Sequence, residues 1–155
     1  MTAPRIDPAG PDDIEPLLDL AKRFHGEEGR GLDAAGEAAL RGIVSGEPLA
    51  RCWIVRRADR PVGYLVLTVG FSVEYGGRDG FIDDLYLVES ERGHGVGAAL
   101  LEFAIGAARE FGIRTLHLEV DPLNDSASGL YRSRGFFENG RRLMQLPLVD
   151  DVTPP

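Results

Sequence analysis

The segment 81–120 constrains the fold of this chain more than any other. "FIDDLYLV" and "TLHLEV" each have the composition of a β-strand. Between them, the apolar positions from about Val96 to Phe111 cover most of a helix circumference, which predicts a helix packed on a sheet along a broad face. A strand, a helix and a second strand in this order predict a right-handed parallel crossover.

The residues before this crossover predict an antiparallel meander. "ARCWIVRRADRPVGYLVLTVGFS" contains two β-rich runs around "ADRP", a hairpin signal with Pro61 in the turn region. "EYGGRDG" turns the chain again before the strand that begins at Phe81. Short connections imply antiparallel pairing. The expected fold class is therefore α/β, a mixed and mostly antiparallel sheet with one βαβ crossover.

Shorter signals predict the remaining elements. "RID" before Pro8 indicates a first strand, and "GPDDIEPLLDLAKRF" a helix capped by Asp12 or Asp13. "HGEEGRG" has the composition of a loop, "LDAAGEAALRGIV" that of a weaker second helix, and "NDSASGLYRSR" that of a short helix. We expect the segment 136–148 to form closing strands.

Length and composition are those of a single soluble domain. The chain has 155 residues, of which 43% are hydrophobic and 27% charged. The N-terminus lacks a signal-peptide pattern, and no apolar run approaches the roughly 18 residues of a membrane span. Cys52 is the only cysteine, which excludes an internal disulfide and a cysteine-based zinc cluster. We expect a cytoplasmic protein with one domain over residues 1–148 and a flexible tail over 149–155.

The formal net charge of −8 bears on the partners of the protein. Nucleic acid binding would need a basic face, so we expect no nucleic acid partner, and the absence of a long apolar run argues against a membrane partner. A negative cleft concentrates amines, which suits a cationic substrate. An acidic surface that only maintains solubility accounts for the charge equally well.

The glycine-rich stretch "GHGVGA" has two interpretations as a phosphate site. It matches the dinucleotide fingerprint G-x-G-x-x-[GA], with Glu119 or Asp121 about 20 residues further on. In a dinucleotide-binding unit, however, the first glycine follows the strand almost directly. Here "ESER" separates Val88 from Gly93, and an antiparallel meander precedes the unit. A nicotinamide or flavin site is the less favoured alternative.

The second interpretation starts from Arg92, which gives the pattern R-x-x-G-x-G. The amides of the loop, the N-terminus of the following helix and a guanidinium would together attract an anion such as a pyrophosphate. A glycine turn needed only for close packing is the structural alternative.

At this point the chain resembles the GNAT-type N-acetyltransferase superfamily over nearly its whole length. "FIDDLYLVESERGHGVGAALL" resembles the strand, R/Q-x-x-G-x-G/A loop and helix of that family. A second family pattern, N-x-x-A-x-x-L-Y-x-x-x-G-F, matches Asn124, Ala127, Leu130, Tyr131, Gly135 and Phe136.

The resemblance implies acetyl-CoA as co-substrate, held between two splayed strands. It implies that main-chain groups of Leu85, Tyr86 and Leu87 pair with the acetyl and pantetheine amides, and that Asn124 touches the pantetheine arm. The residues expected to cradle the pyrophosphate are Arg92, Gly93, His94, Gly95, Val96, Gly97 and Ala98.

Acetyl transfer to an amine requires a neutral amine, a stabilised oxyanion and a proton for the departing thiolate. Tyr131 occupies the position of the sulfur-facing tyrosine of the family, and a phenol stays protonated at neutral pH. We therefore expect Tyr131 to donate to the thiolate. Packing of the short helix is its structural alternative.

Asp83 and Asp84 form an unusual pair in the middle of a predicted strand. Strand alternation sends them to opposite faces, and aspartate is disfavoured in strands and costly to bury, so at least one should face a polar cleft. "IDDLYL" also resembles the Leu-Glu-Asp-Phe-Phe-Val segment of spermidine/spermine-type acetyltransferases. That correspondence implies Asp83 as the base, directly or through water, and Asp84 as a substrate anchor. Pairing with an arginine, or a wet sheet edge, is the alternative for either.

Other polar residues have weaker signals. Glu74 could add negative charge to the acceptor site, and Phe24 and Glu28 lie in the stretch "FHGEEG", where the family often shapes its acceptor pocket; solvated loop is the alternative for both places. The three histidines are too scattered to suggest a metal, and none is expected. Cys52 is expected in the core.

These observations predict an enzyme that transfers acetyl from acetyl-CoA directly to a primary amine, because no cysteine falls in the catalytic motifs. The expected acceptor is a cationic small molecule such as a polyamine or an aminoglycoside-like compound; a protein N-terminus or lysine stays open. A non-catalytic acyl-CoA-binding sensor and a dinucleotide-binding oxidoreductase are the alternatives. The resemblance implies a homodimer.

Overall fold

The computed structural model describes residues 2–150. It divides into two compact units, one ending at Glu119 and the other beginning at Val120, and each is described by itself. The organisation into one domain stays a prediction, and residues 151–155 of the expected tail lie outside the described part. Within that part, no helix has both the length and the apolar composition to cross a membrane.

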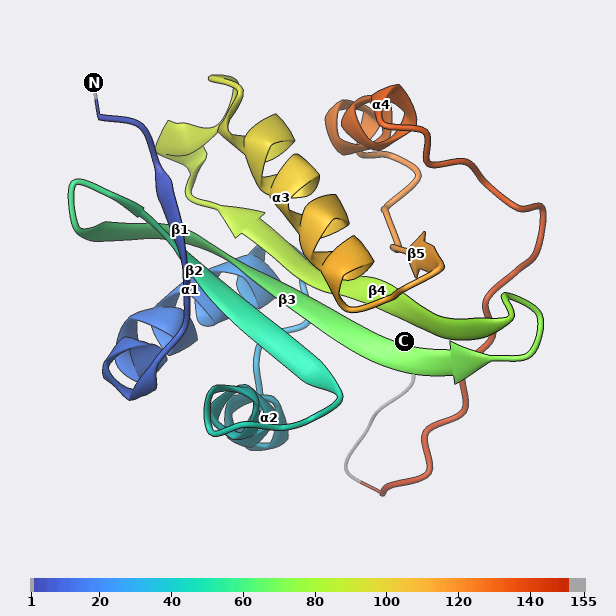
Figure 1. Ribbon diagram of the computed structural model, residues 1–155. Helices are drawn as coiled ribbons and strands as arrows, with labels where there is room; N and C mark the ends of the chain where they lie inside the picture. The colour runs from blue at the N-terminus through green and yellow to red at the C-terminus, as the bar shows by residue number, and fades with distance from the viewer. Residues whose placement is uncertain (1, 151–155) are drawn as a thin grey trace. The chain divides into compact units, whose positions relative to one another are not determined.

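The first unit contains a five-stranded mixed sheet with strands in sequence order (Figure 1). The first four strands pair antiparallel, and the fifth pairs parallel to the fourth. This arrangement confirms the expected fold class. The strands are β1 Arg5–Pro8, β2 Ala50–Arg57, β3 Arg60–Ser72, β4 Gly77–Leu87 and β5 Thr115–His117.

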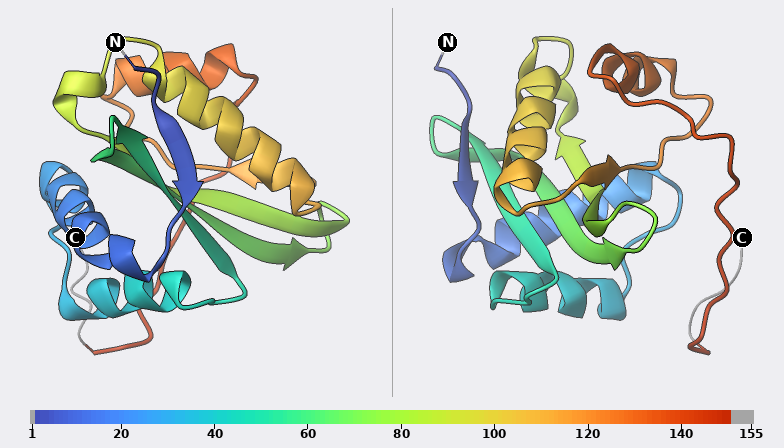
Figure 2. Two further views of the ribbon diagram at one scale, coloured as in Figure 1. Left: turned by 60° about the vertical axis from the view of Figure 1, so that its left-hand side comes forward. Right: turned by 45° about the vertical axis from the view of Figure 1, so that its right-hand side comes forward.

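Helices cover both faces of this sheet (Figure 2). On one face, α1 (Ile14–Glu27) and α2 (Ala34–Val44) pack on a core that includes Tyr64 and Tyr86. On the other, α3 (Val96–Glu110) follows β4 and leads to β5, as expected for the crossover. Short 3-10 turns at Pro11–Asp13 and Glu89–Glu91 precede α1 and α3.

The loop prediction for "HGEEGRG" is wrong at its start, because α1 continues through His25 and Gly26 to Glu27. The ring of Phe24 contacts the rings of Tyr64 and Tyr86, with centroids 6.4 Å and 5.5 Å away. These contacts hold the last turn against the sheet and outweigh the roughly 1 kcal/mol that a glycine costs inside a helix.

The turn between β2 and β3 is tighter than predicted. Ala58 and Asp59 adopt left-handed φ values of 47° and 64°, as in a two-residue primed turn, which fits the twist of the flanking strands. Pro61 therefore lies inside β3, opposite Arg56, and not in the turn.

A β-bulge interrupts the pairing of β3 with β4. Val66 lies opposite Asp84 and Leu67 opposite Ile82, so Asp83 is an extra residue that has no paired residue in β3. The simple alternation that would send the two aspartates to opposite faces therefore does not apply at Asp83.

The pairing of β4 with β5 is short. It covers three residue pairs and ends at Phe81 and His117, although "TLHLEV" predicts a strand through Val120. Beyond this point β4 continues to Leu87 with β3 as its only strand partner among the described residues. The separation of the two strands agrees with the splay that the family resemblance implies.

The second unit contains α4 (Asp125–Ser133), which confirms the predicted short helix. Asn124 caps it by accepting a hydrogen bond from the Ala127 N–H at 3.1 Å, and Gly135 ends it with a φ of +92°. Residues 136–148 form no strand, contrary to expectation. A strand requires a hydrogen-bonded partner, which an apolar pattern alone does not supply.

Substitution of Gly63 by alanine is expected to destabilise the protein by about 1–3 kcal/mol. A β-carbon at Gly63 would collide with the Tyr86 carbonyl oxygen and lie 2.6 Å from Leu87 Cδ2. Gly106→Ala in α3 is the matched control, because a β-carbon there meets nothing within 4 Å. It should stabilise by about 0.5–1 kcal/mol. Urea unfolding measures both; equal effects would contradict the prediction.

Candidate active site

The glycine loop has the backbone geometry of an anion cradle. Gly93 and Gly95 adopt φ values of +76° and +81°, and Gly95 is the N-cap residue of α3. No side chain caps this helix, and its first turn contains no acidic residue. Its first N–H groups and its positive helix end are therefore available to an anion, as the R-x-x-G-x-G interpretation predicts.

A buried ion pair fixes the entry to this loop. The Arg57 guanidinium on β2 lies 2.7 Å from a carboxylate oxygen of Glu91, and both side chains are mostly buried. The hydrogen bond from Arg57 lowers the pKa of the Glu91 carboxyl. The pair joins the turn before the loop to the sheet.

The Arg92 side chain connects the loop with α1. Its Nε donates to the Leu87 carbonyl at 2.9 Å, and a terminal nitrogen lies 2.8 Å from a carboxylate oxygen of Glu27. The guanidinium also lies over the Tyr86 ring, 5.4 Å from the centroid, and the Tyr86 hydroxyl donates to Glu27 at 3.0 Å. Arg92 thus bridges the expected pyrophosphate loop, the end of β4 and the last turn of α1.

The expected main-chain partners of the cofactor lie on the part of β4 that has separated from β5. Leu85, Tyr86 and Leu87 pair with β3 on one side. No strand of the described residues pairs with their other side. Its peptide groups can therefore bond to an extended amide chain as one strand bonds to another. This edge, which leads to the glycine loop, fits the pantetheine arm of an acyl-CoA.

Asp84 is the centre of a polar cluster under α1. Its Oδ2 accepts a hydrogen bond from the Tyr64 hydroxyl at 2.7 Å and lies 3.1 Å from His25 Nε2. The Asp84 side chain is only 14% exposed. The hydrogen bond to Asp84 raises the pKa of His25, while burial raises the pKa of the Tyr64 hydroxyl.

Asp83, at the bulge, has a different environment. The residue is exposed, unlike Asp84. Desolvation by the surrounding protein, followed by repulsion from Asp84, raises the pKa of the Asp83 carboxyl, and His25 opposes this shift. Two carboxyl groups and an imidazole therefore interact at one place on β4.

The structure brings only some of the expected acceptor residues together. Phe24 joins the cluster through its ring, 5.2 Å from the His25 ring. Glu28 lies exposed at the C-cap of α1. Glu74 lies in the turn before β4, and seven residue steps of strand, about 23 Å, separate Gly77 from Asp84. The acceptor role of Glu74 stays a prediction.

Two expected site residues belong to the second unit. Tyr131 lies on α4 with its ring 6.0 Å from that of Phe136. Asn124 uses its side-chain oxygen as the cap of the same helix. Their roles toward a bound acyl-CoA stay predictions.

Sequence reasoning missed three residues of the polar network: His25, Glu27 and Tyr64. The expectation of a loop hid the helical spacing that puts Phe24 and Glu27 on the same side of α1 as Ala21 and Leu17. Tyr64 lies in the apolar run "YLVLTV", which gave no sign of a polar partner. A buried tyrosine needs a hydrogen-bond partner, and this rule could have linked it to an aspartate of the next strand.

Cys52 is buried on β2, and burial raises the pKa of its thiol to about 12. We expect a disulfide reagent at pH 8 to modify no thiol in the folded protein and one thiol per chain in 8 M urea. A fast reaction of the folded protein would contradict this buried environment. The silent thiol also allows the release of free CoA to be followed with the same reagent.

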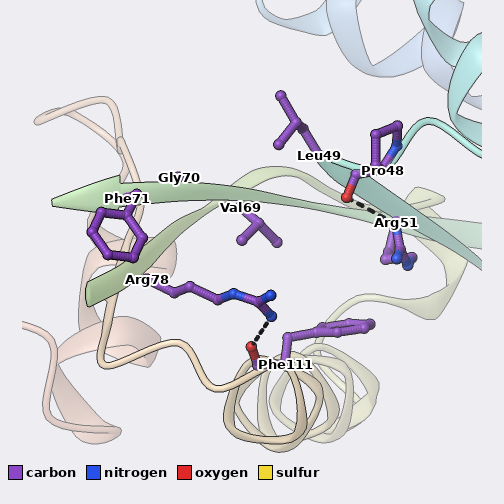
Figure 3. Close-up of a pocket in the computed structure, with 8 residues that line it drawn as sticks. All are labelled: Pro48, Leu49, Arg51, Val69, Gly70, Phe71, Arg78 and Phe111. Carbon is purple, nitrogen blue, oxygen red and sulfur yellow. Dashed lines mark hydrogen bonds between the residues drawn. The ribbon is translucent and has the colours of Figure 1, made fainter.

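Among the described residues, no group of three or more histidine, cysteine, aspartate or glutamate side chains is placed to hold a metal ion. A hollow of about 560 Å³ lies at the C-terminal end of α3 (Figure 3). The glycine loop lies at the other end of this helix. Its lining is largely apolar, with Arg51 and Arg78 at its sides, and Arg78 donates to the Phe111 carbonyl at 2.8 Å. None of the expected site residues lines it.

Comparison with known proteins identifies the family of the chain. The profile of the Acetyltransferase (GNAT) family matches residues 14–136, and the chain belongs to this family. It is 32% identical over 109 residues to the peptidyl-lysine N-acetyltransferase YjaB of Escherichia coli strain K12. That match covers 70% of the chain and 60% of the relative.

Solved structures share the fold. An integron cassette protein from the mobile metagenome of Cole Harbour Salt Marsh has 34% identity and a TM-score of 0.81, with 97% of this chain and 91% of that chain covered. The aminoglycoside N-acetyltransferase AAC(6')-Iy, solved with CoA, has 16% identity and a TM-score of 0.80, with 96% and 97% covered. The predicted family and fold are therefore confirmed.

Proposed function

We propose that this chain transfers the acetyl group of acetyl-CoA directly to a primary amine. The observation that carries the proposal is the β4 edge that leaves β5 after Phe81 and His117 and leads into an uncapped, left-handed glycine loop. The edge supplies amide partners for a pantetheine arm, and the loop supplies N–H donors for a pyrophosphate. Membership of an acetyltransferase family supports the same cofactor.

The proposed acceptor is an alkylammonium group, as in a polyamine or a lysine side chain. Asp83 is an exposed carboxyl beside Asp84 on β4, in a chain of net charge −8, and both features attract a cation. The name of the E. coli relative, a peptidyl-lysine acetyltransferase, supports a lysine acceptor. Tyr131 is proposed to donate a proton to the departing thiolate. The residues expected to hold or deprotonate the amine before that step are Asp83 and Asp84 on β4, with Phe24 on α1 beside them. The expected homodimer stays a prediction.

Thiol release from acetyl-CoA tests the proposal, with polyamines, aminoglycosides, free lysine and lysine peptides as acceptors. Selective release with polyamines would assign a small-molecule acceptor, and release only with lysine peptides would assign a protein acceptor. Acetyl-CoA binding without release from any amine would instead favour the sensor function. Thermal stabilisation by NADH and not by acetyl-CoA would favour the oxidoreductase.

A further inference from the structure

His25, Asp84 and Tyr64 form a connected group, of which only Asp84 lies in a segment that resembles a family motif. They come from α1, β4 and β3, respectively, and meet at one oxygen, Asp84 Oδ2. This oxygen accepts a hydrogen bond from the Tyr64 hydroxyl at 2.7 Å and lies 3.1 Å from the His25 ring nitrogen Nε2. Because two partners already occupy it, Asp84 is better suited to orient His25 than to hold a substrate.

The geometry determines which imidazole nitrogen is basic. An ionised carboxylate only accepts hydrogen bonds, so the Nε2 that faces Asp84 must carry a proton. In the neutral ring, Nδ1 then carries the lone pair. Asp84 therefore orients the basic nitrogen away from itself.

The basic nitrogen is also open to solvent. None of the buried side-chain nitrogen and oxygen atoms in the described part of the chain lacks a hydrogen-bond partner. His25 is half-buried and only its Nε2 has such a partner, so Nδ1 must have accessible surface. The His25 side chain as a whole is 28% exposed.

The group lies beside the proposed cofactor edge. Asp84 directly precedes Leu85, the first of the three residues whose main chain is proposed to bind the acyl-CoA amides. Asp83, the bulge residue, directly precedes Asp84, whose carboxylate contacts His25 Nε2. An ammonium held by Asp83 would therefore lie within the same neighbourhood as His25 Nδ1.

We propose that His25 accepts the proton of the substrate ammonium at Nδ1, with Asp84 as its positioning residue and Asp83 as the anchor of the cation. This inference rests on the proposed function. The ammonium gives one proton to Nδ1, and the freed lone pair forms a bond to the thioester carbon. The carbon–sulfur bond then breaks, the leaving sulfur takes the proton of the Tyr131 hydroxyl, and a second proton from the attacking nitrogen restores that hydroxyl. The imidazolium returns its proton to solvent.

The charges around His25 set the direction of its pH dependence. Asp84 and Asp83 face it from β4, Tyr64 contacts it through Asp84 from β3, and Arg30 approaches from the segment after α1. The hydrogen bond and the charge of Asp84 raise the pKa of His25, whereas burial and Arg30 lower it, and the net direction is upward. Because the neutral ring is the active form, kcat/KM should rise with pH through a value above the ordinary 6.5.

The test compares the pH profiles of kcat/KM for the wild-type enzyme, His25→Gln and His117→Gln. His117 is a matched control, because its Nε2 also lies beside a carboxylate, that of Asp79, at 3.2 Å. We expect His25→Gln to lose at least 100-fold of kcat/KM at neutral pH. In place of the wild-type acid limb, its kcat/KM should rise tenfold per pH unit up to the pKa of the amine, because only the neutral amine then reacts. We expect His117→Gln to keep the wild-type profile. Nuclear magnetic resonance of the three histidines should give His25 the same pKa as the acid limb.

The outcomes separate the two proposals. Absence of thiol release from the wild-type enzyme with every amine overturns the proposed function. If the wild-type enzyme turns over and His25→Gln keeps the acid limb of the wild-type profile, the role of His25 is overturned and the proposed function is not. If His25→Gln does not fold, a His25 pKa that differs from the wild-type acid limb overturns it.

Discussion

The Tyr131→Phe variant is expected to turn over at least 100-fold more slowly than the wild-type enzyme, with nearly unchanged affinity for acetyl-CoA. Phenylalanine keeps the ring that packs near Phe136 and removes only the hydroxyl. If this hydroxyl protonates the departing thiolate, its loss removes general acid catalysis, which contributes about 10² to 10⁴-fold. Steady-state thiol release gives kcat, and calorimetry gives the dissociation constant of acetyl-CoA.

The control for this variant is Tyr75→Phe. The Tyr75 ring lies 4.9 Å from the ring of His117, in the region where the β3–β4 turn approaches β5. Removal of its hydroxyl should leave kcat within about twofold. Unchanged turnover of Tyr131→Phe would remove Tyr131 from the mechanism, and equal losses in both variants would indicate a general effect of the substitution.

The Gly95→Val variant is expected to bind acetyl-CoA at least tenfold more weakly. Gly95 has a φ of +81°, which costs a non-glycine residue about 1–2 kcal/mol and a β-branched residue more. The loop can relieve this strain only by leaving the cradle conformation, and 1.4 kcal/mol corresponds to a tenfold change in affinity. Calorimetric titration with acetyl-CoA measures the loss.

Gly112→Val provides the control, since Gly112 has a φ of +71° after the other end of the same helix. A β-carbon meets nothing within 4 Å at either position, so both variants carry the same kind of backbone strain. Both should lower the free energy of unfolding by about 1–3 kcal/mol. Only Gly95→Val should lose acetyl-CoA affinity; an equal loss in Gly112→Val would show that the affinity follows global stability.

Periodicity and turn signals were sufficient to predict the order and type of the elements in the first unit. They failed where contacts between distant segments decide the result. Sequence alone ends α1 too early, because the ring contacts of Phe24 with β3 and β4 are invisible in the local pattern. It also extends β5 to Val120, because the point at which two strands separate depends on their partners.

The candidate site was predictable to a similar extent. The glycine loop and the β4 edge could be located, since their function depends on backbone geometry that glycine spacing and strand order predict. The partners of Asp84 could not, because His25 and Tyr64 lie 59 and 20 residues away in the chain. Pattern reasoning also expected simple alternation at Asp83, where one extra residue changes the phase of the strand.

The bulge also separates the charge of Asp83 from the register of β4. Removal of Asp83 would bring Ile82 and Asp84 together as neighbours while leaving each opposite its present partner in β3. Substitutions at Asp83 change a charge, whereas its deletion should leave Ile82 and Asp84 on the faces that they now occupy, because their partners Leu67 and Val66 are adjacent in β3 and already point in opposite directions. The bulge thus holds a carboxyl at a position that the pairing of β3 with β4 does not require, so this charge can be removed without turning any other side chain of the strand.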